Sequence, residues 1–80
     1  MKIDADHYHQ KLGSDERCQI DTWLAGLQVD PTRCLSIEFR EDGSSILELY
    51  VEPRRVVNSR IDVSMRHVDD AWPEFVANSN

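Results

Sequence analysis

Several common signatures are missing from this 80-residue chain. The first residues, Met1 to Asp6, lack the apolar core of a signal peptide, and no later stretch is apolar enough to suggest a transmembrane span. There is no glycine-rich phosphate loop, nucleophile elbow or zinc-hydrolase motif, and the chain has only three glycines. The sequence therefore predicts a cytoplasmic protein that has no membrane partner and no cofactor and is not an enzyme.

Cysteine is scarce as well. Cys18 and Cys34 are too few for a disulfide framework and lack the CxxC spacing of a zinc or redox site. Cys18 lies opposite the apolar stripe of a predicted helix, and Cys34 falls on the polar face of a predicted strand. Two exposed thiols indicate a reducing compartment. A nucleophilic role would need a basic neighbour and a cleft, and the sequence shows neither.

A positive net charge is also missing. Fifteen acidic residues outnumber nine basic ones, giving −6, which argues against simple phosphate-driven binding to nucleic acid. An acidic inhibitor that occupies the nucleic-acid-binding surface of another protein is one alternative. Residues 53–66 nevertheless hold Arg54, Arg55, Arg60 and Arg66 against a single aspartate. This segment could bind a phosphate, a nucleic acid or an acidic partner, or its arginines could pair with nearby glutamates and protect an edge strand.

The most informative pattern is a pair of alternating runs, residues 34–40 and 45–51, around a turn signal. They predict a β-hairpin. A two-residue loop would mix polar and apolar side chains on each face. A three-residue loop over Glu41–Gly43 pairs Ile37 with Leu47 and places Gly43 at a left-handed position. This register predicts one core face, made of Leu35, Ile37, Phe39, Leu47, Leu49 and Val51.

The remaining segments predict elements that cover this face. Residues 4–12 suggest a short helix, and residues 14–28 an amphipathic helix with Ile20, Trp23, Leu24 and Leu27 on one stripe. Residues 60–66 suggest a third strand with Ile61, Val63 and Met65 inward, and a short helix starts near Asp69-Asp70. Val56-Val57 either extend the third strand or form their own. The predicted fold is one α+β domain over 1–80: an N-terminal helix on a three-stranded antiparallel β-meander, then a short C-terminal helix, with 1–13 and 77–80 as candidate mobile segments.

The densest cluster of metal-ligand types is Asp4, Asp6, His7 and His9. On a helix, His7 and His9 would point about 200° apart, because only residues three or four apart share a face. The cluster therefore favours a solvated N-terminal surface over a metal site. His67 follows the third strand and is interpreted as a half-exposed sheet residue.

The second face of the hairpin carries the candidate partner-binding residues. They are Glu38, Arg40, Ile46, Glu48 and Tyr50, with Arg54 and Arg55 beside them. Glu38 and Glu48 could support acid–base chemistry, but a solubilising pattern is the simpler interpretation. An unpaired edge at residues 34–40 or 60–66 would offer a route to a homodimer, which so small a domain could need for stability.

The helix that runs into Trp23-Leu24-Ala25-Gly26-Leu27-Gln28-Val29-Asp30-Pro31, followed by a hairpin, resembles small accessory proteins of actinobacterial phages or prophages. The resemblance covers roughly Lys2 to Val51. It implies a role in host cytoplasm through binding host or phage proteins, and it carries over no catalytic residue. The sequence thus predicts a small non-enzymatic protein–protein interaction module.

Overall fold

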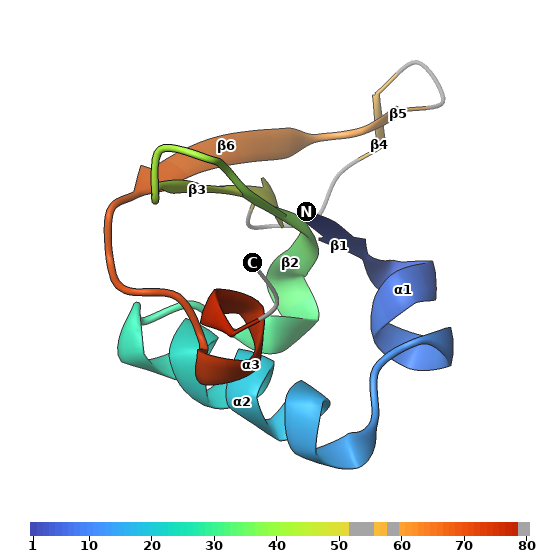
Figure 1. Cartoon of the computed structure of the whole chain (residues 1–80). Coiled ribbons are helices and arrows are strands. Elements are labelled where there is room, and N and C mark those ends of the chain that lie inside the picture. The colour runs from blue at the N-terminus through green and yellow to red at the C-terminus, as the bar shows by residue number, and fades with distance from the viewer. Residues whose placement is uncertain (52–55, 58–59, 79–80) are drawn as a thin grey trace.

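A four-stranded antiparallel sheet forms one layer of the protein and helices form the other, in a computed structural model that describes residues 1–51, 56–57 and 60–78 (Figure 1). The sheet order is β1-β2-β3-β6, and β4 and β5 form a separate two-stranded pair. The predicted α+β class is confirmed, whereas the three-stranded meander misses one strand. The elements are β1 Lys2–Asp4, α1 Ala5–Gln10, α2 Ser14–Gly26, the 3-10 turn η1 Pro31–Arg33, β2 Cys34–Phe39, β3 Ser45–Tyr50, β4 Val56–Val57, β5 Arg60–Ile61, β6 Val63–Val68 and α3 Glu74–Ala77.

The β2–β3 hairpin has the predicted register beside its turn. Ile37 lies opposite Leu47, and Gly43 adopts a φ of 90°, where a Cβ would be strained. The Gly43 N–H donates to the Arg40 carbonyl at 3.0 Å, and the Arg40 N–H donates to the Ser44 carbonyl at 2.9 Å. Asp42 accepts the Ser44 backbone N–H at 2.9 Å, and the Ser44 donors lower the pKa of this carboxyl. The turn therefore fixes which side chains face the helices.

A β-bulge at the start of β2 overturns part of the predicted core face. The register shifts between Cys34 and Ser36, so Leu49 lies opposite Cys34 and not opposite Leu35. Leu35 and Val51, both expected in the core, are half-buried. Cys34, expected on the polar face, packs against the core instead. The bulge inserts one residue into β2, so Cys34 takes the position opposite Leu49 that a regular ladder would give to Leu35.

The N-terminal segment begins with a strand that the sequence pattern did not predict. Ile3 lies opposite Ile37 in an antiparallel pair and is buried, while its two neighbours are exposed. Asp4 then caps α1 by accepting the His7 N–H at 2.9 Å. The predicted helix over 4–12 is thus shortened to Ala5–Gln10. A three-residue strand is too short to show alternation, and only its partner strand stabilises it.

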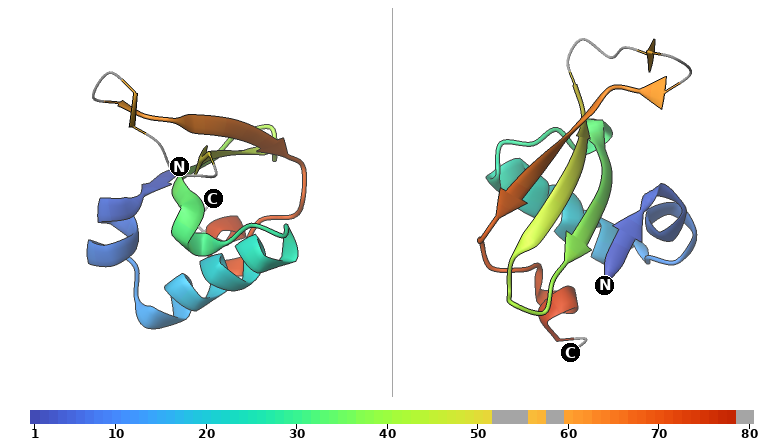
Figure 2. Two further views of the ribbon diagram at one scale, coloured as in Figure 1. Left: turned by 180° about the vertical axis from the view of Figure 1, so that it is seen from behind. Right: turned by 90° about the horizontal axis from the view of Figure 1, so that it is seen from above.

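Helix α2 carries the predicted apolar stripe toward the sheet. Ile20, Leu24 and Leu27 are buried, and Trp23 packs against the same core. Gly13 occupies the N-cap position, where its N–H donates to the Glu16 carboxylate at 2.9 Å. Figures 1 and 2 show α2 and α3 on the same side of the sheet. The core accordingly lies between β2, β3 and α2.

The C-terminus of α2 is a Schellman motif with glutamine at the left-handed position. The Val29 N–H donates to the Leu24 carbonyl at 2.9 Å, and the Gln28 N–H donates to the Ala25 carbonyl at 3.0 Å. Gln28 has a φ of 61°, and Val29 is buried with Leu24. The helix ends at Gly26, two residues before the predicted end, because the chain must reverse for Val29 to enter the core.

The third predicted strand is divided, and its inward face is the opposite of the one expected. β6 pairs with β3 so that Arg66 lies opposite Leu47 and Ser64 opposite Leu49. Opposite residues share a face, so Val63 and Met65 point away from the core. The side chain of Ile61 lies outside the described residues. Val56–Val57 pair with Arg60–Ile61, which makes them a strand of their own.

The C-terminal segment closes the core through aromatic contacts. The rings of Trp23 and Trp72 each lie 5.5 Å from the ring of Phe39, and Trp23 Nε1 donates to the Ala71 carbonyl at 2.8 Å. Helix α3 begins at Glu74, later than the predicted start near Asp69. Pro73 precedes it, and Trp72 is half-buried against the core.

Gln28→Gly is expected to raise the free energy of unfolding by about 1 kcal/mol, because glycine adopts the left-handed conformation without the Cβ penalty. For a domain of this size, such a change raises the melting temperature by roughly 4–8 °C. Thermal unfolding followed by circular dichroism measures the shift. Gln28→Ala, which retains the Cβ, is the matched control and should give no gain. Equal gains from both variants would contradict the strain at this position.

Candidate functional site

The outer face of the sheet, opposite the helices, is the candidate site. Figure 2 (right) looks onto this face, with α2 behind the strands. The strand register sets its rows: Glu38 lies opposite Ile46, which lies opposite His67, and Glu48 lies opposite Met65. The face is defined by Lys2, Glu38, Ile46, Glu48, Tyr50, Val63, Met65 and His67.

Most of the predicted partner-binding residues meet on this face. Ile46, Glu48 and Tyr50 alternate along β3 and are half-buried. Glu38 projects from β2, and its carboxylate lies 3.2 Å from Arg40 Nη1 in an ion pair whose side chains are 46% and 48% exposed. A pair so exposed contributes little to stability. Arg54 and Arg55 lie outside the described residues.

Sequence reasoning missed the contribution of β6 to the outer face. Val63 is 39% exposed and Met65 is 63% exposed, although the alternation had placed both in the core. Val68, the buried residue of this strand, belongs to the opposite phase. Val68 was the one residue in the sequence that indicated the correct inward face. Ile61, Val63 and Met65 alternate in the opposite phase, and together they indicated the wrong one. Ser64 and Arg66 occupy the helix-side positions because β6 lies at the border of the core.

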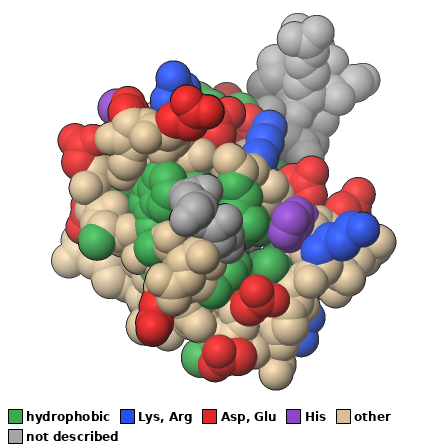
Figure 3. Space-filling view, in the orientation of Figure 1, with side chains coloured by type: hydrophobic (Ala, Val, Ile, Leu, Met, Phe, Trp, Pro, Cys, Tyr) green, Lys and Arg blue, Asp and Glu red, His purple; other side chains and the backbone are tan. Residues whose placement is uncertain are grey.

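The chemistry of this face suits contact more than catalysis. Apolar Ile46, Tyr50 and Met65 surround Glu48 on this face, and the side chains of Glu38 and Glu48 are half-buried. Of the arginines that could have formed a basic surface, Arg66 turns to the helix side, where its Nη1 donates to the Leu27 carbonyl at 2.9 Å. In the view of Figure 3, acidic side chains are scattered with basic ones between them.

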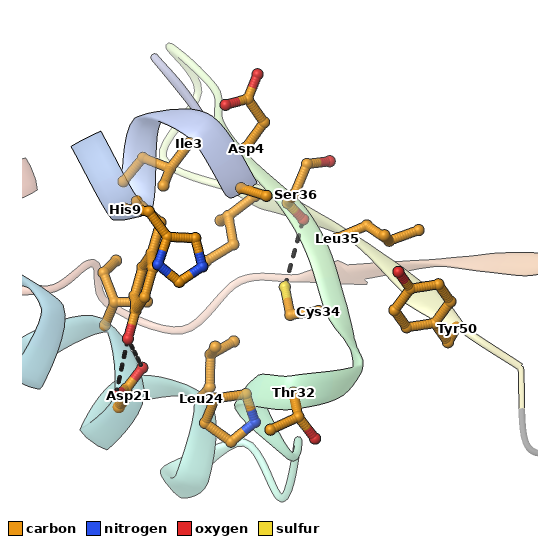
Figure 4. A pocket seen from close by; sticks show the side chains of 15 residues that line it. Ile3, Asp4, His9, Asp21, Leu24, Thr32, Cys34, Leu35, Ser36 and Tyr50 are labelled. Atoms are coloured by element: carbon orange, nitrogen blue, oxygen red, sulfur yellow. Dashed lines mark hydrogen bonds between the residues drawn. The ribbon is translucent and has the colours of Figure 1, made fainter. Parts of the chain in front are cut away.

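A concave feature lies on the helix side, where a cavity of about 420 Å³ opens between α1, α2 and the start of β2 (Figure 4). β1 pairs only with residues 36–38 of β2, so Cys34 and Leu35 line the uncovered part. The Tyr8 hydroxyl donates to both Asp21 oxygens at 2.9 and 3.0 Å, and Cys34 Sγ donates to the Ser36 carbonyl at 3.5 Å. These polar groups already have partners within the chain, so they do not call for a ligand.

Burial sets the acidity of two side chains in this cavity wall. It raises the pKa of the Cys34 thiol to about 11, and the nearby Glu48 carboxylate acts in the same direction. Burial and the hydrogen bond to Asp21 raise the pKa of Tyr8. Both groups are therefore neutral at physiological pH, and Cys34 lacks the thiolate character of a reactive cysteine.

The N-terminal histidines receive no support as a metal site. Within residues 1–51, 56–57 and 60–78, no three His, Cys, Asp or Glu side chains are grouped to hold a metal ion. His9 lines the cavity, and Asp4 is engaged as the cap of α1. In the same described part of the chain, none of the helices has the length and hydropathy needed to cross a bilayer.

Cys34 is expected to react with iodoacetamide at pH 8 far more slowly than exposed Cys18. A thiol with a pKa of about 11 is only about one part in a thousand thiolate at that pH. Mass spectrometry of timed samples measures both rates, and labelling of Cys34 should accelerate as the pH rises toward 10. Cys18→Ser is the control that leaves one thiol. Rapid labelling of Cys34 at pH 8 would contradict its burial.

Comparison of the chain with protein-family models, with curated proteins and with solved structures gave no match in any of the three.

Proposed function

We propose that this protein is a small non-enzymatic module that binds a partner protein through the outer face of its sheet. The observation that carries the proposal is the pair of exposed apolar side chains on β6, Val63 and Met65, beside Ile46 and Tyr50. In the described part of the chain, the helices pack on the opposite side. Soluble monomers rarely leave a large apolar patch open, and such patches mark interaction sites.

The arrangement around this patch supports the same proposal. Methionine and aromatic side chains are enriched at protein interfaces, and a polar rim surrounds their apolar centre. Here Met65 lies on the border strand β6 and Tyr50 at the end of β3, while Glu38 and Lys2 lie toward the β1 side. The rim would fix the orientation of a partner, and the centre would supply the buried area. In the setting implied by the phage resemblance, that partner is a host or phage protein.

The two alternatives have weaker support. An acidic inhibitor needs a field of carboxylates, but Glu38 is paired with Arg40, and apolar Ile46 and Met65 lie beside Glu48. Nucleic-acid binding through the Arg54/Arg55/Arg60/Arg66 segment loses one member, since Arg66 binds the Leu27 carbonyl on the helix side. Arg54, Arg55 and the side chain of Arg60 lie outside the described residues. The outer face therefore remains the better-supported site.

The proposal predicts that a photo-crosslinking amino acid at Tyr50 captures a protein from host lysate, whereas one at exposed Thr22 on α2 does not. Ile46→Glu should reduce capture at least about tenfold, because it places an unpaired charge in the apolar centre. Thr22→Glu adds the same charge on the helix layer and is the matched control. Circular dichroism checks that each variant is folded, and mass spectrometry identifies the captured species.

Other results would contradict this assignment. Equal capture from positions 50 and 22, or capture that Ile46→Glu leaves unchanged, would place the binding surface elsewhere. A basic protein partner released when salt rises from about 0.1 to about 0.5 M would favour the acidic inhibitor. Recovery of nucleic acid as the main species would favour the arginine segment.

A further inference from the structure

The β6 strand forms one border of the sheet. The strand order β1-β2-β3-β6 places it outermost, and in the described part of the chain no strand pairs with its other side. Five of its six residues are exposed, and Val68 alone is buried. An edge of this kind presents a row of backbone donors and acceptors to solvent.

The hydrogen-bond phase of the ladder identifies which residues form that row. The Val51 N–H donates to the Asp62 carbonyl at 3.1 Å. In an antiparallel pair, residues alternate between those whose backbone groups turn toward the neighbouring strand and those whose groups turn away. Asp62 is therefore a residue whose backbone groups turn toward β3. Ser64 and Arg66, two and four residues later, turn theirs the same way. Val63, Met65 and His67 consequently turn their N–H and C=O groups outward.

The usual devices that block an edge are missing from this strand. It contains no proline or lysine, and its pairing with β3 runs from Ser45↔Val68 to Tyr50↔Val63 without a bulge. Its one arginine, Arg66, could have shielded the edge, but its guanidinium is held by the Leu27 carbonyl at 2.9 Å. The edge is therefore regular, accessible and open to another strand.

We propose that two copies of this chain pair antiparallel through β6, with Met65 opposite Met65 of the second copy on a twofold axis. This register aligns all three outward-turned residues: Val63 lies opposite His67 of the second copy, and His67 opposite its Val63. Each such pair exchanges two hydrogen bonds, about six in total. A second copy is the fitting occupant because a twofold axis makes this row complementary to itself.

Neighbouring registers are worse. A shift that centres the axis on Arg66 places two arginines directly opposite each other, which is destabilising. A shift that centres it on Ser64 leaves His67 opposite Ile61, which belongs to the separate β4–β5 pair. Only the register centred on Met65 uses the whole row and separates the charges. It also brings the exposed Met65 side chains, 63% accessible in each chain, into contact across the axis.

The pairing would join the two sheets edge to edge. Both outer faces would then lie on the same side of the joined sheet and stay exposed. The pairing shares Val63 and Met65 with the partner-binding face, but its hydrogen bonds come from the backbone edge of β6 and it does not use Ile46 of β3. A partner protein would then meet two copies of the apolar centre on one continuous surface. Dimer formation and partner binding can be lost separately, so their tests are distinguishable.

Sedimentation equilibrium over a dilution series tests the dimer. The wild-type chain should pass from monomer to dimer as its concentration rises toward about 1 mM. Met65→Pro should weaken the dimer at least about tenfold while the fold persists, because proline removes an N–H that faces outward and not toward β3. Met65→Leu keeps that N–H and is the matched control. His67→Pro removes the next outward N–H and provides a second variant if Met65→Pro fails to fold.

Cysteine crosslinking tests the register without any proline. In a Cys18→Ser background, Met65→Cys should oxidise to a covalent dimer, since opposite Cα atoms in such a pair lie about 5.5 Å apart. Ser64→Cys and Arg66→Cys should crosslink far more slowly, because each lies roughly 7 Å or more from its copy. A wild-type chain that stays monomeric, or a dimer that survives both proline variants, would overturn the proposal. Faster crosslinking at 64 or 66 would overturn the register.

Discussion

The register of the β2–β3 hairpin is the constraint on which the rest of the structure depends. A slip of one residue would exchange the two faces of both strands, so the turn decides what the helices cover. Gly43 provides the left-handed residue of that turn, and Ile37 then lies opposite Leu47. This alignment determines which face the apolar stripe of α2 packs against. It also determines how β1 pairs with β2 and which residues of β6 face the helices. The outer face consists of the side chains that point away from the helices.

A second constraint holds the two layers in place at the end of α2. The reversal at Gln28 directs Val29 into the core, and the chain then passes through η1 into β2. The same helix end supplies the Leu27 carbonyl that binds Arg66 of β6. A free helix carbonyl is thereby satisfied, and the border strand is fastened to the helical layer. This contact explains why an arginine can occupy a helix-side position of the sheet. It also explains why that arginine protects neither the edge of the strand nor its outer face.

The sequence predicted the local features well and the long-range ones poorly. Alternation and a glycine identified the hairpin, and 3.6-residue periodicity identified α2, because both signals lie within a few turns or strand residues. Strand β1 was missed since three residues show no period, and the bulge at Cys34 was missed since nothing local marks an inserted residue. The inward face of β6 was predicted wrongly because it depends on how β6 pairs with β3. Residues 51–62 separate the two strands, so no local pattern links them. The face that carries Glu38, Ile46, Glu48 and Tyr50 was predicted correctly as a surface, but without Val63 and Met65.

The hydrogen bond from Trp23 to the Ala71 carbonyl has a kinetic consequence. It joins residues 48 positions apart, whereas the hairpin closes over a few residues. Local contacts form quickly, and contacts between distant segments must first overcome the entropy of closing a long loop. We therefore expect the hairpin to form early and the tail that carries Trp72 and α3 to dock last. Until that docking, Phe39 lacks its second aromatic neighbour and the core is open to solvent. In a chain this small, the docking of the C-terminal tail is then both the last step of folding and the step that closes the core to solvent.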